Sequence, residues 1–518
     1  MRAAKKIVSS VLAVCMLAST GAVSAFAAQT DESTGATPNP YVVACEALDA
    51  EYTYTGNDLG AVYSPEKTVF KVWSPTATEV TLNRYATGSD SEEGAADLGS
   101  VPMEKLMDGD KWTGVWTATV EGDIVDTYYT YTITSAHPKS GELQTAETQD
   151  VYSVATGVNG RRSMVCDLSK TNPEGWDNDT HVVPEKQTDS TVWELHVKDF
   201  SWDTDSGVSM ANRGKYLAFT ETGTTLKNEG QIATCIDYLK ELGVTTVQLN
   251  PFYDFQSINE AGDGSQFNWG YDPQNYNVPE GSYSSNPYDG NVRINECKQR
   301  IQALHNAGIS VVMDVVYNHT YSNSKDDSCF QATVPDYYYR MTKTGAFSNG
   351  SGCGNEVSSE RAMTRKFILD SVLYWVNEYH VDGFRFDLMG LMDTETMNLI
   401  RDALDSVDSR LTTWGEGWTG GTSTYPATTC TGEKYYQGVQ KNAKQLNTRV
   451  AFFNDVIRNG IKGTVFDITE KGFIAGNATY AKNIKSGVRA NTTEAQGWTA
   501  LAPEQCVTYA DCHDNATI

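Results

Sequence analysis

The sequence predicts an α/β protein, a (β/α)8 barrel that stops after its seventh strand and is preceded by a small β-sandwich. Over residues 51–170, short alternating runs are broken by Gly, Pro and Asp, which is typical of an antiparallel sandwich. Over residues 191–518, apolar strands alternate with helical patterns, which indicates a parallel sheet. Seven such units are most economically a barrel. A doubly wound open sheet is the alternative, but no Gly-rich phosphate loop follows the first strand.

The first 28 residues predict a secretory signal peptide. Basic residues come first, an apolar stretch over residues 7–18 follows, and Ala25-Phe26-Ala27 forms a small-residue cleavage motif. The apolar stretch is shorter than the roughly 20 residues that span a bilayer. We therefore expect a secreted, extracellular product with no membrane partner after cleavage. Residues 29–50 begin with a Ser-, Thr- and Pro-rich run and are predicted to be a linker.

The composition excludes one class of partner. The formal net charge is −26, and a surface this acidic repels phosphate backbones, so nucleic acid is not an expected partner. Aromatic residues reach 11%, with 28 tyrosines, and their faces suit packing against sugar rings as well as against ordinary cores. A neutral substrate fits these properties better than a charged one.

The sandwich is expected to contain strands near residues 68–73, 79–84, 112–120 and 127–134. The polar stretch over residues 171–190 carries two prolines and is predicted to be a second linker. The barrel strands are then expected at residues 192–197, 244–251, 309–317, 381–388, 411–418, 450–454 and 505–510. Apolar residues at helical spacing lie between them, and Asp393 is a predicted N-cap for a helix over residues 394–407.

Polar clusters follow four of these strands. They are Asp314-Val-Val-Tyr-Asn-His319, Gly383-Phe-Arg-Phe-Asp387, Trp414-Gly-Glu-Gly-Trp418 and Tyr509-Ala-Asp-Cys-His-Asp-Asn515. Each cluster alone has a structural explanation, such as a salt bridge or a turn. Barrel active sites, however, form where the carboxyl ends of the strands meet. Two long segments after strands, residues 253–292 and 320–358, are expected to add to the same face.

Carboxylates that converge on a barrel rim, without a metal motif, favour cleavage of a glycosidic bond. That reaction needs one acid to protonate the leaving oxygen and one carboxylate to meet the cationic carbon. Along a strand Arg385 and Asp387 share a face, so the arginine should keep Asp387 ionised. Glu416 has Trp414 and Trp418 as neighbours, and apolar surroundings should raise its pKa.

The four clusters resemble the ordered signature regions of the α-amylase superfamily, glycoside hydrolase family 13. The resemblance implies that Asp387 is the nucleophile, Glu416 the general acid/base and Asp514 a third carboxylate that binds sugar hydroxyls, with retention of anomeric configuration. It also implies that Arg385 orients the nucleophile and that His319 and His513 contact the sugar before the scissile bond. Trp418 is a further expected substrate-binding residue.

Phe267-Asn-Trp-Gly-Tyr-Asp-Pro273 is similar to the Tyr-Asn-Trp-Gly-Tyr-Asp-Pro signature of type I pullulanases, which cleave α-1,6 links in pullulan, starch and glycogen fragments. Phe267 is the only departure. The resemblance implies that Tyr271 stacks against the sugar beside the scissile bond. Residues 278–283 also look like this subfamily, and the sandwich resembles the family 48 carbohydrate-binding module that precedes such barrels.

The predicted activity is thus a debranching glycoside hydrolase whose partner is an α-glucan polysaccharide or branched oligosaccharide. An isoamylase-type enzyme, an α-1,4-acting amylase of the same superfamily and a non-catalytic glucan-binding protein are the alternatives. No cofactor is required by this chemistry. Family members often bind calcium, but no ligand spacing in the sequence names a metal site.

Two further expectations concern the end of the chain and its cysteines. The family continues beyond the position of Asp514 with an eighth strand, so an unclosed barrel would expose a sheet edge and lower solubility and activity. Cys329 and Cys353 lie in one loop-like region and are the best disulfide candidates, although their spacing alone does not decide the pairing.

Overall fold

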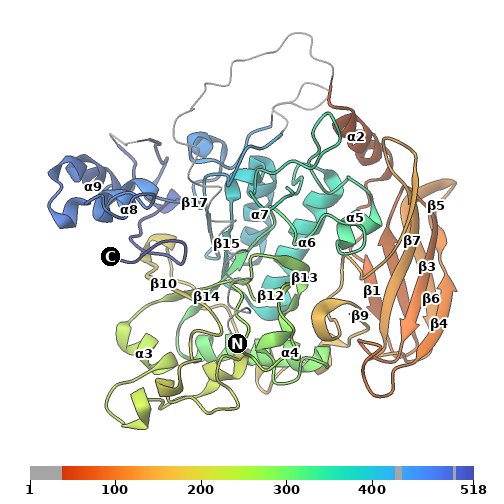
Figure 1. Ribbon diagram of the computed structural model, residues 1–518, viewed down its shortest axis with the longest axis horizontal. Coiled ribbons are helices and arrows are strands. Elements are labelled where there is room, and N and C mark those ends of the chain that lie inside the picture. Colours follow the sequence, from red (N-terminus) through yellow and green to blue (C-terminus); the bar gives the residue numbers. More distant parts are fainter. Residues whose placement is uncertain (1–37, 426–434, 494–496) are drawn as a thin grey trace, which may run out of the picture. The chain divides into compact units, whose positions relative to one another are not determined.

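The N-terminal antiparallel sheets and the seven-stranded parallel sheet occupy separate stretches of the chain (Figure 1). The structure is a computed structural model, and it describes residues 38–425, 435–493 and 497–518. The predicted signal peptide, residues 1–28, and the first part of the predicted linker lie outside the described residues. No helix in the described ranges is long and apolar enough to cross a membrane.

Two antiparallel sheets form the N-terminal part, as predicted. Their orders are β1-β2-β6-β5 and β4-β3-β7-β8, and β9 pairs with β7. Phe70 and Val72 of the first sheet and Leu82 and Tyr131 of the second share one buried core, so the sheets pack face to face. The strands are β1 (Gly60–Tyr63), β2 (Lys67–Trp73), β3 (Ala77–Tyr85), β4 (Asp97–Pro102), β5 (Glu104–Asp108), β6 (Lys111–Glu121), β7 (Tyr128–Ala136), β8 (Leu143–Thr148) and β9 (Ser163–Met164).

A seven-stranded parallel sheet follows in the order β10-β11-β14-β15-β16-β17-β18, which is the order of the strands in the chain. This arrangement confirms the incomplete (β/α) barrel predicted from the sequence. Each strand lies within its predicted range. They are β10 (Val192–Leu195), β11 (Thr246–Leu249), β14 (Ser310–Val315), β15 (Gly383–Phe386), β16 (Thr412–Gly415), β17 (Val450–Phe453) and β18 (Cys506–Val507). The long segment after β11 adds a two-stranded antiparallel sheet, β12 (Tyr253–Phe255) and β13 (Pro273–Pro279).

The parallel sheet is strongly curved, and two contacts demonstrate this. Trp414 of β16 donates a hydrogen bond from Nε1 to Oε1 of Gln248 in β11, at 2.8 Å. In a flat sheet these strands would lie three spacings, or about 14 Å, apart. Glu194 of β10 contacts His513, which follows β18, although β10 and β18 are the first and last strands of the sheet. The curvature therefore brings the strand ends onto one interior site.

Helices alternate with these strands and begin at recognisable caps. The Asp393 side chain accepts a hydrogen bond from the backbone N–H of Thr396 at 2.8 Å, which confirms the predicted N-cap. Asp289 caps helix α4 (Gly290–Asn306), with its side chain accepting a hydrogen bond from the backbone N–H of Asn291. The helices are α2 (Pro40–Tyr52), α3 (Cys235–Leu242), α4 (Gly290–Asn306), α5 (Cys329–Thr333), α6 (Ala362–Tyr379), α7 (Thr394–Val407), α8 (Asp455–Lys462) and α9 (Ala481–Val488).

The two predicted linkers are more ordered than their composition indicates. Residues 40–52 form helix α2, because Asn39 caps its first turn and Pro40 stands at a position where a helix needs no N–H donor. The linker prediction is therefore wrong from residue 40 onward. Residues 171–190 contain only short 3-10 turns, but Trp176 is buried and stacks on His380 with ring centroids 4.3 Å apart.

The expected pairing of Cys329 with Cys353 is also wrong. Cys329 is buried in helix α5, and its thiol is free. Burial raises the pKa of this thiol to about 12, so it behaves as a small apolar core residue. Loop membership in the sequence did not reveal that a short helix carries Cys329 into the core.

Candidate active site

One arginine connects three carboxyl groups at the ends of three neighbouring strands. Arg385 Nη1 lies 2.9 Å from Asp314 Oδ1 and 3.0 Å from Asp387 Oδ1. Its Nη2 lies 2.8 Å from Glu416 Oε1. Strands β14, β15 and β16 position these groups, and the Arg385 side chain is only 3% exposed. The shared face predicted for Arg385 and Asp387 is therefore present, and the guanidinium organises the whole cluster.

The Asp387 carboxylate is held at both oxygens. Oδ1 accepts from Arg385, and Oδ2 accepts a 2.8 Å hydrogen bond from Nδ2 of Asn318, which follows β14. The same Asn318 nitrogen also lies 2.8 Å from the backbone carbonyl of Asp387. These contacts fix the direction in which the carboxylate faces, which is the requirement for a nucleophile or for a group that stabilises a sugar cation.

Glu416 is buried directly after β16. Its Oε2 accepts a hydrogen bond of 2.9 Å from the backbone N–H of Leu388, and its Oε1 contacts Arg385. Burial raises the pKa of Glu416 to about 7, with the charges of Asp387 and Asp514 acting in the same direction and Arg385 opposing them. The sequence predicted a raised pKa. Glu416 is thus suited to exchange a proton near neutral pH.

His513, Asp514 and Tyr271 approach the same cluster from other segments. The Tyr271 hydroxyl donates to Asp314 Oδ2 at 2.6 Å, and its ring stacks on His513 with centroids 5.0 Å apart. His513 Nε2 lies 3.3 Å from Asp514 Oδ1. Burial tends to raise the pKa of Asp514, but the hydrogen bond from His513 lowers it below its usual value. Asp514 is half-exposed and faces solvent more than the other two carboxyls.

Two predicted binding residues have protein partners in the structure. His319 is buried, with Nε2 2.9 Å from the Tyr271 carbonyl oxygen and Nδ1 2.6 Å from Asn318 Oδ1. His319 therefore contacts Tyr271 directly and also contacts Asn318, the residue that holds Asp387. Trp418 packs against the apolar cluster that contains Trp414. Its expected contact with substrate stays a prediction.

Comparisons with known proteins assign this arrangement to a family. Residues 229–359 match the family model "Alpha amylase, catalytic domain", and residues 58–153 match "Carbohydrate-binding module 48 (Isoamylase N-terminal domain)". A pullulanase of Paenibacillus barengoltzii, solved with maltotriose, is 42% identical with a TM-score of 0.82; the match covers 91% of this chain and 69% of that one. The chain belongs to the pullulanase family.

Other pullulanases are similar over the same region. The pullulanase of Bacillus subtilis is 37% identical over 482 residues, a match that covers 92% of this chain and 61% of the relative. The solved pullulanase of Bacillus acidopullulyticus is 44% identical with a TM-score of 0.78, and the match covers 86% of this chain and 51% of that one. The chain therefore spans only part of the length of these relatives.

A cavity of about 500 Å³ lies next to His513, near the cluster formed by Arg385 and its three carboxyl partners. Glu194, His196, Asn250, Trp269 and His513 are among the residues that line it. The Trp269 side chain is 44% exposed, whereas His196 and Asn250 are buried. Asp387, Glu416 and Asp514 do not line this cavity, which adjoins the cluster through His513.

Sequence reasoning missed three residues of this site: Asp314, Asn318 and Glu194. Asp314 and Asn318 stand within a cluster that the sequence did single out, but only His319 received a role there. The buried position of Asp314 raises its pKa to about 7, against the opposing effect of Arg385. No local sequence pattern marked Glu194 as a site residue, because it lies in the first barrel strand and its partner His513 is 319 positions away in the chain.

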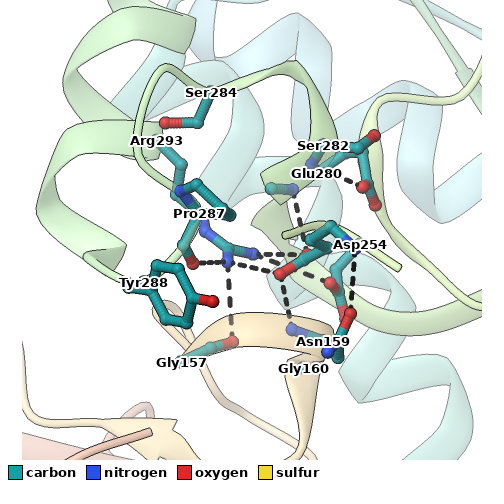
Figure 2. A network of polar contacts seen from close by, with 12 residues as sticks. Gly157, Asn159, Gly160, Asp254, Glu280, Ser282, Ser284, Pro287, Tyr288 and Arg293 are labelled. Atoms are coloured by element: carbon teal, nitrogen blue, oxygen red, sulfur yellow. Dashed lines mark hydrogen bonds and ion pairs between the residues drawn. The ribbon is translucent and has the colours of Figure 1, made fainter. Parts of the chain in front are cut away.

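A separate acidic group has the spacing of a metal site, because Asp254, Glu260 and Glu280 bring carboxylate oxygens within 4.8 Å of one another. Figure 2 shows the Arg293 guanidinium reaching into this group. Arg293 Nη1 and Nη2 lie 3.0 and 2.9 Å from the two Glu260 oxygens. Arg293 Nη1 also lies 3.7 Å from Asp254 Oδ1, so the group is described as a buried ion-pair network. The family resemblance allows a calcium ion, but these contacts do not identify a calcium site.

This network makes stability depend on pH. Burial, with the charge of Glu260, raises the pKa of Glu280 to about 8. A carboxyl with a raised pKa in the folded state stabilises the fold through its protonated form. Its contribution to the free energy of unfolding is complete below the ordinary pKa of 4.5 and is lost as the pH rises through about 8. We therefore expect the thermal midpoint of Glu280→Gln to fall less between pH 5 and pH 8 than that of the parent protein, by about 2 °C or more.

Thermal unfolding of both proteins at several pH values measures this difference. Glu185→Gln is the matched control, since the Glu185 side chain is 86% exposed, and it should keep the pH slope of the parent. Identical slopes for Glu280→Gln and the parent would contradict the assignment.

Proposed function

We propose that this protein is a debranching glycoside hydrolase that cleaves α-1,6-glucosidic links in pullulan and in branched fragments of starch or glycogen, with retention of anomeric configuration. The observation that carries the proposal is the Arg385 cluster, in which one guanidinium holds Asp387 and Glu416 together at adjacent strand ends. Pairing a fixed carboxylate with a carboxyl of pKa near 7 is what retaining glycoside hydrolysis requires.

In the proposed reaction, Glu416 and Asp387 have different roles in two successive steps. Glu416, protonated, donates its proton to the leaving glycosidic oxygen while Asp387 attacks the anomeric carbon and forms a glycosyl ester. Glu416, now ionised, takes a proton from water, and the water oxygen attacks the same carbon and releases Asp387. Asp514 and His513 bind the hydroxyl groups of the sugar at the site of cleavage, and the Tyr271 ring contacts its apolar face.

The substrate class is supported by the relatives. Pullulanases from Paenibacillus barengoltzii and Anoxybacillus have been solved with maltotriose and maltotetraose, respectively, and the Paenibacillus enzyme also with maltohexaose and α-cyclodextrin. Matching residues 58–153 to a carbohydrate-binding module supports an α-glucan partner as well. Export through a signal peptide over residues 1–28 is part of the proposal, and N-terminal sequencing of the mature protein tests it.

Sizing the products released from pullulan tests the proposed function. We expect maltotriose as the main product, because cleavage of every α-1,6 link in pullulan leaves units of three glucoses. An α-1,4-acting amylase would instead release trisaccharides that keep the α-1,6 link. An isoamylase-type enzyme would debranch glycogen and leave pullulan intact, and a binding protein would release nothing. Any of these three results would overturn the proposal.

A further inference from the structure

Glu194, on strand β10, holds both the backbone and the ring of His513. Its Oε2 accepts a hydrogen bond from the His513 backbone N–H at 2.6 Å, and its Oε1 lies 2.9 Å from the ring Nδ1. Two contacts from one carboxylate restrict both the position of the chain and the rotation of the imidazole. The segment that carries Asp514 is therefore tied to the opposite edge of the curved sheet.

Glu194 is itself held by a chain of hydrogen bonds. Gln248 of β11 donates from Nε2 to Glu194 Oε1 at 3.0 Å. The Oε1 atom of Gln248 accepts from Trp414 Nε1 at 2.8 Å, and Trp414 lies two positions before Glu416 in the sequence. The chain runs across the interior of the barrel from the strand of Glu416 to His513. Gln248 and Glu194, the two inner members, each have a partner on both sides, so the chain connects His513 to β16.

The groups that face His513 keep it charged. Burial alone would lower the pKa of His513, but its contacts with Asp514 and Glu194 raise it to about 11. The Tyr271 hydroxyl lies 3.5 Å from Nδ1, and His196 lines the same cavity with a pKa that burial lowers. With Glu194 at Nδ1, the other ring nitrogen of His513, Nε2, forms an ion pair with Asp514 Oδ1 at 3.3 Å.

We propose that Glu194 is a positioning residue of the active site, which orients the His513 ring so that Nε2–H directs the Asp514 carboxylate toward the sugar. Its kinetic consequence rests on the proposed function, whereas its effect on His513 does not. The competing description is a structural clamp that joins β10 to the segment after β18 and has no influence on the sugar site.

Glu194→Gln tests the proposal, because it keeps the shape of the side chain and removes its charge. The His513 ring is followed by NMR of the protein labelled at its seven histidines, with His513→Gln identifying the signal. The titration is followed from pH 5 to pH 11, and in the parent His513 should lose its charge only near the top of this range. In Glu194→Gln its midpoint should fall by about one pH unit or more. Glu194→Asp, which restores the charge, should recover much of the parent's titration.

Kinetics on pullulan supply the second readout. We expect kcat/KM of Glu194→Gln to fall about tenfold through kcat, as when one hydrogen bond to a charged group is lost in the transition state. Glu185→Gln, at an exposed position, should change neither readout.

Three results would overturn the proposal. The first is a folded Glu194→Gln protein with an unchanged His513 titration. The second is a changed titration with an unchanged rate. The third is a rate loss accompanied only by a lower thermal midpoint. If the parent does not hydrolyse pullulan, the proposed function fails, and the NMR titration alone decides whether Glu194 holds His513.

Discussion

Asp387→Asn should abolish hydrolysis of pullulan, with kcat falling about 10⁴-fold or more, as found when an enzyme loses its nucleophile. An amide cannot form the glycosyl ester. The amide keeps the shape of the carboxylate, and its carbonyl oxygen can accept a hydrogen bond from either Arg385 or Asn318, the two residues that donate to Asp387 in the parent. The fold should therefore survive, and the loss should appear in kcat rather than in the thermal midpoint.

Two measurements make this result specific. Maltotriose binding, followed by calorimetry, should persist in Asp387→Asn, because the substitution keeps the shape of the side chain and leaves His513, Asp514 and Tyr271 in place. Asp326→Asn, whose side chain is 69% exposed, is the matched control and should keep the parent rate. An Asp387→Asn protein with more than a tenth of the parent kcat would show that another group attacks the sugar.

Glu416→Gln should lower kcat on pullulan about 10²- to 10⁴-fold, the usual contribution of a general acid. The parent needs Glu416 protonated, and burial raises its pKa to about 7, so kcat/KM of the parent should fall as the pH rises above about 7. The variant cannot lose a proton there, and this alkaline decline should disappear from its profile.

A substrate whose leaving group needs no protonation distinguishes a general acid from a residue with only a structural role. A glycosyl fluoride leaves without protonation, so Glu416→Gln should form the glycosyl ester from it at a rate much closer to that of the parent. Equal losses on pullulan and on the fluoride, or an alkaline decline that persists in the variant, would contradict the role of Glu416.

The order of strands could be predicted because local pattern and topology agree in this chain. Runs such as residues 310–315 are buried over their whole length, as strands of a parallel sheet are, and helical spacing separates them. The Asp393 cap has a local signature and was predicted at the correct residue. Helix α2 was missed because its neighbours are polar and its burial depends on residues about 290 positions later, as in the contact of Cys45 with Asp336.

The site could be predicted in part for the same reason. Asp387, Glu416 and Asp514 each follow a strand, so the barrel rule alone brings them together. Contacts across the barrel carry no local signal, and so the roles of Asp314 and Glu194 required the structure. The single guanidinium of Arg385 that joins three carboxyls is likewise a consequence of strand register: Asp314 pairs with Arg385 across β14 and β15, and Arg385 with Trp414 across β15 and β16.

The central claim is that Asp387 attacks the sugar, and trapping the glycosyl-enzyme tests it most directly. Glu416→Gln, treated with a fluorosugar glycosyl fluoride, should accumulate a covalent intermediate, because the ester forms and its hydrolysis lacks a general base. Peptide mapping by mass spectrometry should place the added sugar on Asp387. A sugar on any other residue, or release of product without a trapped ester, would contradict the account.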